Sequence, residues 1–351
     1  MTLTASAPAP APTTATLAEK APTVLSLIAG YVGHRTVAIG LRQGLIRRLA
    51  DEPGSTPDDL AEALDLDPFY VGVWCRAGLA AGVLERSDDG YRLGDHIATL
   101  LLDTTSPAWD GGVFAVTEAP EMFGRFETHF ATGERMWWDD TSPEWIAAVA
   151  GTGTPFYTRL VPGGLAQVPG LAERLDAGVR VIDTACGAGN GAVRLATAYP
   201  RCTVVGVDGD RHSVEKARER VAAAGLADRV EVVHSALEDF TVDQPATLVI
   251  NNISMHECRD ADRVTENVKA ALEPGGWFVI SDFPFPDTDE GLRSVPGRIM
   301  TGIQFFEAQI DDQLLPRAAY DDLLARHGFV DIGSVQLTPM HALTWGRRPA
   351  A

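Results

Sequence analysis

Cysteine is scarce in this chain of 351 residues, which contains only four. The chain has no CxxC motif and no zinc-finger spacing, which argues against a disulfide framework and against a structural zinc site built on cysteines. Scattered, reduced thiols are typical of intracellular proteins, so we expect a cytoplasmic location. The cysteines are Cys75, Cys186, Cys202 and Cys258.

Positive charge is also scarce. Lysine and arginine together number 29, against 48 aspartates and glutamates, and the formal net charge is -19. A protein that binds duplex nucleic acid needs a basic face, so we expect no nucleic-acid partner.

Long apolar runs are missing as well. We find no stretch of about 18 consecutive apolar residues, so we expect no membrane span and no membrane partner. The apolar run at residues 24–32 is interrupted by Ser26 and Gly30, and His34 follows it closely. We interpret this run as part of an amphipathic first helix rather than as a signal peptide.

The length favours two domains, and the composition of the chain changes along it. Residues 1–21 are rich in alanine, proline and threonine and are predicted to be a disordered tail. We expect a winged-helix dimerisation domain at residues 22–100. A helical linker that covers the active site is expected at residues 101–175, and an α/β domain at residues 176–351.

The winged-helix prediction rests on the order of elements. Apolar residues recur at helical spacing from Thr23 to about Ala50, and Ser55-Thr56-Pro57 has the N-cap hydroxyl and first-turn proline of a helix start. Another helix is predicted at residues 67–82. The segments 83–86 and 90–93 flank a polar turn and are predicted to form a small hairpin.

A winged helix often binds DNA, but the charges of this one argue against that function. Its presumed recognition helix carries a single cation, Arg76, whereas phosphate contacts require lysine and arginine. We therefore expect a module that makes a homodimer or covers a substrate. The surrounding acidic residues are Asp58, Asp59, Glu62, Asp65 and Asp67.

Short apolar strands alternate with helices from residue 179 onward, which predicts a parallel sheet covered on both faces. The expected strands are 179–183, 202–207, 230–233, 247–251 and 277–281, and the segments 329–337 and 341–345 are expected to form a terminal antiparallel hairpin. The predicted fold class is therefore α/β, with a Rossmann-like domain.

The first of these strands runs into a glycine-rich turn, Asp183-Thr184-Ala185-Cys186-Gly187-Ala188-Gly189. Small residues at this place let a ligand approach the backbone amides at the start of the next helix. The second strand ends at Asp208, and an acidic residue about 20 positions after the turn suits the two hydroxyls of a ribose. The combination predicts a nucleotide-type cofactor site.

The whole array resembles the class I S-adenosylmethionine (SAM)-dependent methyltransferases, specifically the two-domain O-methyltransferase type. The glycine-rich turn, Val207-Asp208 and Leu272-Glu273-Pro274-Gly275-Gly276 are the matching pieces. The resemblance implies that SAM is the cofactor. It also implies that Asp183, Gly187 and Gly189 border the cofactor, that Asp208 holds the ribose, and that the adenine meets the loop at Ser235, Ala236 and Leu237. Asn251, which ends the fourth strand, completes the expected cofactor site.

Two positions depart from the family pattern. The family usually has glycine where Ala185 stands, which predicts an altered turn. It often has an acidic residue where Ala236 stands, so the adenine would lose an acceptor.

The loop after the fourth strand contains His256 and Glu257. It lies at the carboxyl end of a strand, where open α/β sheets bind ligands. A histidine can take a proton from a hydroxyl, an amine or an activated carbon. In the resembling family this pair is the general base and its acidic neighbour, although Cys258 stands where tryptophan is usual.

Between the fifth strand and the last helix, residues 292–309 interrupt the α/β pattern. In the resembling family this insertion lines the acceptor pocket, so Met300, Gln304 and Phe305 are candidate acceptor contacts. We expect methyl transfer to a small, largely apolar acceptor, such as an aromatic compound or another secondary metabolite, with no metal ion. Three alternatives stay open: a SAM enzyme that catalyses cyclisation or decarboxylation, a metal-assisted C-methyltransferase with His256 and His341 as ligands, and a SAM-sensing regulator.

Overall fold

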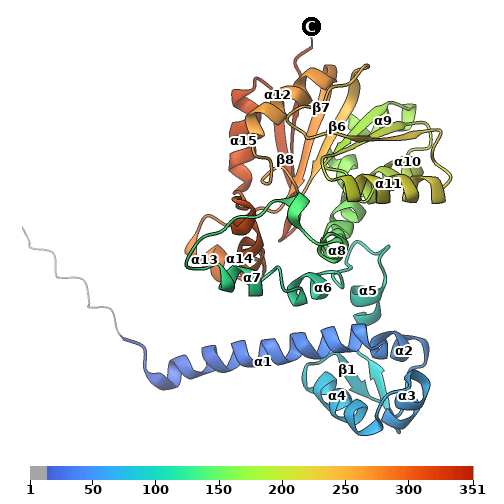
Figure 1. Cartoon of the computed structure of the whole chain (residues 1–351), viewed down its shortest axis with the longest axis vertical. Coiled ribbons are helices and arrows are strands. Elements are labelled where there is room, and N and C mark those ends of the chain that lie inside the picture. Colours follow the sequence, from blue (N-terminus) through green and yellow to red (C-terminus); the bar gives the residue numbers. More distant parts are fainter. Residues whose placement is uncertain (1–13, 351) are drawn as a thin grey trace, which may run out of the picture. The chain divides into compact units, whose positions relative to one another are not determined.

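The structure is a computed structural model that describes residues 14–350. The chain folds into two compact units, and the division along the sequence falls between Ala98 and Thr99. The elements of each unit are labelled in Figure 1. The segment 101–175, which the sequence predicts to be a separate linker, therefore belongs to the C-terminal unit. Residues 1–13 of the predicted tail lie outside the described residues.

The N-terminal unit has the predicted order of helices followed by a hairpin. Its first helix begins at Leu17, so residues 17–21 are helical and their assignment to a disordered tail is wrong. A capping box explains the early start, because Thr16 and Glu19 satisfy each other's backbone amides. The elements are α1 (Leu17–Arg42), α2 (Leu45–Asp51), α3 (Pro57–Leu64), α4 (Pro68–Ala80), β1 (Leu84–Arg86) and β2 (Tyr91–Leu93).

Helix α1 exposes many large apolar side chains along its first four turns. Leu25, Ile28, Tyr31 and Val32 are each more than half exposed. By length and composition alone α1 is long and apolar enough to cross a membrane, which differs from the expectation drawn from sequence. A core helix of a soluble protein and a signal sequence pass the same test.

The C-terminal unit begins with helices that precede its sheet. The longest of them, α8, starts at a serine cap, Ser142, and a first-turn proline. The elements are α5 (Ile97–Leu102), which spans the division between the units, α6 (Val113–Glu118), α7 (Gly124–Thr128), η1 (Trp138–Asp140), α8 (Pro143–Arg159), η2 (Leu160–Gly164), η3 (Leu165–Gln167) and α9 (Leu171–Ala177).

The sheet has seven strands in the order β5-β4-β3-β6-β7-β9-β8. The first five are parallel, whereas β9 pairs antiparallel with both β7 and β8. This confirms the predicted parallel sheet and terminal hairpin. The strands are β3 (Arg180–Thr184), β4 (Thr203–Asp208), β5 (Val230–His234), β6 (Ala246–Asn252), β7 (Leu272–Asp282), β8 (Val330–Thr338) and β9 (His341–Arg347).

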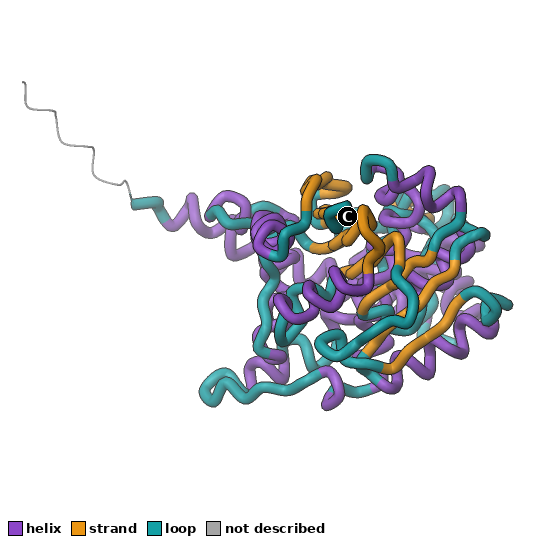
Figure 2. The backbone as a smooth tube through the Cα atoms, turned by 90° about the horizontal axis from the view of Figure 1, so that it is seen from above, coloured by secondary structure: helices purple, strands orange, loops and turns teal. Residues whose placement is uncertain are grey.

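Helices cover both faces of this sheet (Figures 1 and 2). Successive strand residues point to opposite faces, and the core divides accordingly: Val181 joins one buried cluster and Ile182 the other. The remaining helices are α10 (Asn190–Ala198), α11 (Arg211–Ala223), α12 (Ala261–Ala271), α13 (Asp289–Arg293), α14 (Val295–Glu307), η4 (Ala308–Ile310) and α15 (Arg317–Arg326).

Strand order reverses between β3 and β6, because β4 and β5 lie on one side of β3 while β6 and β7 lie on the other. Open α/β sheets bind ligands at the carboxyl ends of the strands beside such a switch point. Asn251 of β6 is level with Thr184 of β3 there, and Asn252 is level with Ser281 of β7. The ends of these strands therefore position the site.

Candidate active site

The glycine-rich turn after β3 is shaped by three residues with positive φ. Ala185, Gly187 and Gly189 have φ values of 55°, 51° and 80°. Ala185 thus adopts the left-handed conformation that favours glycine, although it is alanine. A side chain at Gly189 would also meet Ala217 at 3.0 Å, whereas a side chain at Gly187 would meet nothing within 4 Å. The turn therefore leaves open space beside Gly187.

Asp208 reaches back to this turn from the end of β4. Its Oδ2 accepts a hydrogen bond from the Gly187 amide at 2.8 Å, and its Oδ1 accepts one from the Asp210 amide at 2.9 Å. Burial raises the pKa of this carboxyl, and the two amide hydrogen bonds offset part of that effect. A carboxylate has about four acceptor positions, so Asp208 keeps capacity for further donors.

At the ends of β3 and β6, two buried acceptor atoms have no hydrogen-bond partner among the described residues: Oδ2 of Asp183 and Oδ1 of Asn251. The other oxygen of Asp183 accepts a hydrogen bond from the Tyr157 hydroxyl at 2.8 Å, and Asn251 donates to Thr184. Burial raises the pKa of Asp183 to about 7. Unsatisfied buried acceptors are costly, so a ligand with hydrogen-bond donors would complete this part of the site.

The predicted adenine loop also lies beside Asp208. The Ser235 amide donates to the Asp208 carbonyl at 2.9 Å, and a side chain at Gly209 would lie 3.6 Å from the Cα of Ala236. Ala236 is exposed, while Leu237 packs against a core cluster. The structure thus brings together the predicted cofactor residues from the ends of β3, β4, β5 and β6.

His256 lies in the loop after β6, and its side chain is almost completely buried. Its Nδ1 is 2.9 Å from Oδ2 of Asp282, and the same oxygen accepts a hydrogen bond from the Tyr320 hydroxyl at 2.6 Å. The backbone amide of Phe283 donates to the other oxygen of Asp282. The contact with Asp282 holds a proton on Nδ1, so Nε2 becomes the side of the ring that is available for chemistry.

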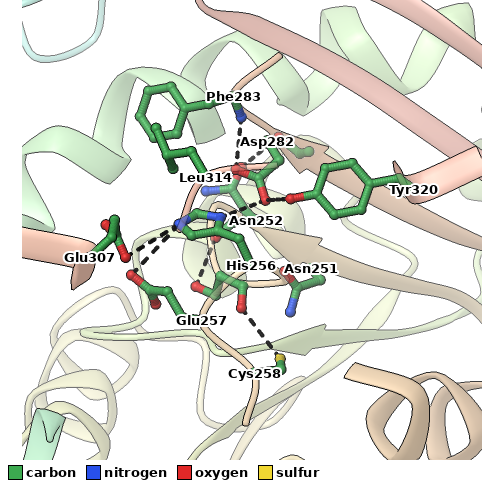
Figure 3. Close-up of polar contacts among 12 residues, drawn as sticks. Asn251, Asn252, His256, Glu257, Cys258, Asp282, Phe283, Glu307, Leu314 and Tyr320 are labelled. Atoms are coloured by element: carbon green, nitrogen blue, oxygen red, sulfur yellow. Dashed lines mark hydrogen bonds and ion pairs between the residues drawn. The ribbon is translucent and has the colours of Figure 1, made fainter. Parts of the chain in front are cut away.

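Two glutamates face that available nitrogen (Figure 3). Nε2 of His256 is 3.8 Å from Oε2 of Glu307 and 4.0 Å from Oε1 of Glu257. Oε2 of Glu307 is buried and has no hydrogen-bond partner among the described residues. Ligand atoms of His256, Glu257 and Glu307 lie within 4.8 Å of one another, close enough for the group to hold a cation.

The ionisation of this cluster follows from its crowded acids. Burial lowers the pKa of His256, but attraction by Asp282 and Glu307 outweighs it and raises the pKa well above its usual value. Burial and repulsion from Glu307 raise the pKa of Glu257 well above its usual value. The same two causes raise the pKa of Asp312 to about 6. The cluster is therefore short of positive charge.

His341 does not join His256, so the metal site with both histidines as ligands is wrong. Nε2 of His341 is 2.8 Å from the Ser281 hydroxyl, and Nε of Arg159 donates to its Nδ1 at 3.1 Å. Ser281 and Asp282 are neighbours on β7, so their side chains point to opposite faces of the sheet. His341 contacts Ser281 and His256 contacts Asp282, so the two histidines lie on opposite sides of the strand.

The predicted acceptor residues lie on α14 but differ in their surroundings. Met300 is buried in a cluster with Phe156, Phe283 and Leu314. Gln304 accepts a hydrogen bond from the Leu314 amide through its Oε1, and the Phe305 ring packs 4.9 Å from the ring of Phe126. Met300 therefore shares a cluster with Phe283, the residue next to Asp282, while Gln304 braces the chain after α14.

Four members of the cluster were not predicted from sequence: Asp282, Glu307, Asp312 and Tyr320. Asp282 carried a usable signal, because it ends a strand next to β6 at the carboxyl edge of the sheet. Glu307 and Tyr320 come from α14 and α15, and we see no sequence pattern that singles them out.

Comparison with known proteins fits this geometry. Residues 175–313 match the family model described as "Methyltransferase domain". The C-terminal unit has the fold of solved SAM-dependent methyltransferases. Its fold and its matches support SAM as the cofactor.

Two curated relatives match part of the chain. The carboxy-S-adenosyl-L-methionine synthase of Klebsiella pneumoniae is 30% identical over 141 residues, which are 38% of this chain and 57% of that protein. Methyltransferase GfsG of Streptomyces halstedii is 35% identical over 130 residues, which are 35% of this chain and 45% of that protein. The chain thus spans about half the length of these relatives.

Solved structures match nearly the whole chain. An O-methyltransferase family protein from Burkholderia thailandensis has a TM-score of 0.70 and 18% identity, covering 94% of this chain and 98% of that one. Human N-acetylserotonin methyltransferase, solved with SAM, has a TM-score of 0.67 and 16% identity, covering 96% and 100%. At these identities the likeness shows the fold, including the helical N-terminal part.

Proposed function

We propose that this protein transfers the methyl group of SAM to a small, largely apolar acceptor, with His256 as the general base. The observation that carries this proposal is the 2.9 Å contact between His256 and Asp282 at the same sheet edge as Gly187 and Asp208. This edge of the sheet therefore carries both His256, an oriented proton acceptor, and the residues expected to bind the cofactor.

The residues at the switch point suit the cofactor. SAM carries an ammonium group and two ribose hydroxyls, all of which are hydrogen-bond donors, and this edge offers acceptors: Asp208, the unpartnered Oδ2 of Asp183 and the unpartnered Oδ1 of Asn251. The open space beside Gly187 lets a ligand approach the backbone. When bound, SAM supplies a methyl group on a sulfonium sulfur, and this sulfur leaves readily as a neutral thioether.

The protein's own part is alignment and proton transfer. Methyl transfer gains most from holding the nucleophile in line and from excluding water. A base is needed only if the nucleophile must lose a proton, and Nε2 of His256 is placed for that step by Asp282 and Tyr320. The surrounding acids raise the pKa of the ring because they stabilise the imidazolium, so His256 acts as the base in its unprotonated form and turnover should increase with pH.

Apolar side chains beside the base support an apolar acceptor. Phe156, Phe283, Met300 and Leu314 form a buried cluster, and Phe283 directly follows Asp282. Ligand pockets are commonly walled by such residues around a few polar groups.

A second candidate is a reaction of SAM other than methyl transfer. It is favoured by the likeness to the Klebsiella pneumoniae protein, whose name describes a synthase of a SAM derivative. The two candidates share the cofactor site and differ in their products.

Incubation with SAM labelled in its methyl group tests the proposal. We expect the label in a methylated acceptor, with one S-adenosylhomocysteine released for each label transferred. Consumption of SAM without S-adenosylhomocysteine, or with the label retained on a SAM derivative, would favour the second candidate. A chain that does not bind SAM would contradict both.

We also propose a homodimer in the cytoplasm. The exposed apolar side chains of α1, including Leu25 and Ile28, would be covered by a second copy of the chain. The four cysteines are free, which suits a reducing compartment.

A further inference from the structure

Three side chains converge at this place: Nε2 of His256 lies 4.0 Å from Oε1 of Glu257 and 3.8 Å from Oε2 of Glu307. These separations are beyond hydrogen-bond distance, so His256 does not satisfy either glutamate. The raised pKa values keep His256 and Glu257 protonated while no cation lies between them. A cation at this place would lower both pKa values, and the three atoms would then all be hydrogen-bond acceptors, with the remaining ring proton on Nδ1 beside Asp282. A group that fits between them must supply donors or positive charge.

One of these acceptors specifically lacks a partner. The Glu307 side chain is only 4% exposed, and its Oε2, the atom nearest His256, has no hydrogen-bond partner among the described residues. A buried carboxylate without a partner is costly. Glu307 therefore points to a ligand that binds at this place.

The charge balance of the cluster points the same way. Four carboxyl groups, from Glu257, Asp282, Glu307 and Asp312, act on the single histidine or on one another. Arg259 acts on Asp312, while its guanidinium also stacks on the Trp137 ring at 3.8 Å. The cluster thus has room for a second cation besides a protonated His256.

We infer that the acceptor atom is the nitrogen of an amine, which enters as an ammonium carried on an apolar body. This inference rests on the proposed function. An ammonium offers up to three N–H donors on one atom, which matches the three converging acceptors, whereas a hydroxyl offers one. The apolar cluster of Phe156, Phe283, Met300 and Leu314 suits the rest of such a molecule.

The proton balance follows from this placement. The ammonium R–NH3⁺ gives one proton to Nε2 of His256 and becomes R–NH2, which then turns so that its lone pair points away from Nε2 toward the methyl group while an N–H group stays bonded to Glu257 or Glu307. The nitrogen lone pair then forms the N–CH3 bond while the S–CH3 bond of SAM breaks, and its electron pair stays on sulfur. The products are R–NH2–CH3⁺ and S-adenosylhomocysteine, with His256 protonated.

A divalent metal ion is the competing occupant. Three ligand atoms around a metal at about 2.1 Å would be roughly 3.4 Å apart, and three acceptors around an ammonium at about 2.8 Å would be roughly 4.6 Å apart. The observed 3.8 and 4.0 Å lie between these values. The proposed role of His256 as the base favours the ammonium over the metal ion, because a metal ion bound to Nε2 would remove the lone pair that proton transfer requires.

Benzylamine and benzyl alcohol form a matched pair of probes for this site. Calorimetry with the full chain saturated with S-adenosylhomocysteine at neutral pH should give about 10-fold tighter binding of the amine, or more. Glu307→Gln and Glu257→Gln should each weaken the binding of benzylamine by about 10-fold and leave the affinity for benzyl alcohol unchanged. Glu290→Gln on the exposed start of α13 is the control and should change neither probe.

Melting temperatures of the variants would show that each one is folded. Equal or tighter binding of the alcohol, no binding of either probe, or an amine preference that survives both glutamine variants would overturn the inference. So would stoichiometric Zn²⁺ that blocks benzylamine and is lost in Glu307→Gln. Failure to bind S-adenosylhomocysteine would instead contradict the proposed function.

Discussion

Nδ1 of His256 lies 2.9 Å from Oδ2 of Asp282, and the same carboxylate oxygen accepts the hydroxyl of Tyr320. Asp282 thereby determines which nitrogen of the ring faces Glu257 and Glu307. The orientation of the base depends on a residue at the end of β7, rather than on the loop that carries the histidine.

Asp282→Asn tests this dependence. The amide cannot stabilise the imidazolium and can hold the ring in the wrong tautomer, so we expect turnover to fall by roughly 10²- to 10⁴-fold, on the scale of the general-base contribution. SAM affinity should be unchanged. Tyr320→Phe removes only one hydrogen bond to the same carboxylate and should have a smaller effect in the same direction. Equal turnover of Asp282→Asn and wild type would contradict the assignment.

Asp208→Ala tests the placement of the cofactor. Loss of a buried carboxylate that is available to ribose hydroxyls should weaken SAM by about 10- to 100-fold, since hydrogen bonds to charged groups contribute roughly 1.5–3 kcal/mol. Asp243→Ala, an exposed carboxylate before β6, is the matched control. Calorimetry would measure both. Unchanged affinity in Asp208→Ala would show that the ribose lies elsewhere.

Buried His341 should make the stability of the protein sensitive to acid. Burial, followed by repulsion from Arg159, lowers its pKa from 6.5 to about 3. The unfolded chain therefore binds one more proton than the folded chain between these values. The free energy of unfolding should have its full value above about pH 6.5. Below that pH it should fall by roughly 1.4 kcal/mol for each pH unit.

His341→Gln should remove that slope, because glutamine can accept from Arg159 and donate to Ser281 without titrating. Urea unfolding at several pH values between about 4 and 7 measures it. His212→Gln at the start of α11 is the control and should keep the wild-type slope. An unchanged slope in His341→Gln would mean that other groups cause the acid sensitivity.

The apolar face of α1 predicts a dimer that a single charge disrupts. Ile28→Glu places a carboxylate on a side chain that is 57% exposed in one chain, so the folded monomer should tolerate it. Light scattering should give a dimer for wild type and a monomer for the variant. Wild type that is monomeric and floats with lipid vesicles would instead assign α1 to a membrane surface.

Much of the fold was accessible from sequence because each parallel strand is a short apolar run that ends in a polar or small residue. The same rule correctly predicted the edge that carries Gly187 and Asp208. The alternation of side chains along β7 places His341 on the opposite side from His256, because Ser281 and Asp282 point to opposite faces. The start of α1 was missed because the composition before Pro22 obscured the capping box at Thr16.

The rest of the cluster could not be predicted from local pattern. Tyr320 is 38 residues from Asp282, and only the packing of α15 on the sheet brings the two together. Glu307 ends a helix whose spacing is typical of core, and its carboxylate meets His256 only in the folded chain. Acidic residues on exposed helices are common, so their sequence carries no signal of burial.

The rate of methyl transfer by His256→Ala, measured beside its SAM affinity, tests the central claim most directly. The account predicts unchanged SAM affinity, a loss of turnover of roughly 10²- to 10⁴-fold at neutral pH, and partial recovery at high pH as the acceptor loses its proton in solution. Normal turnover by His256→Ala at neutral pH would contradict it, because alignment alone would then carry the reaction.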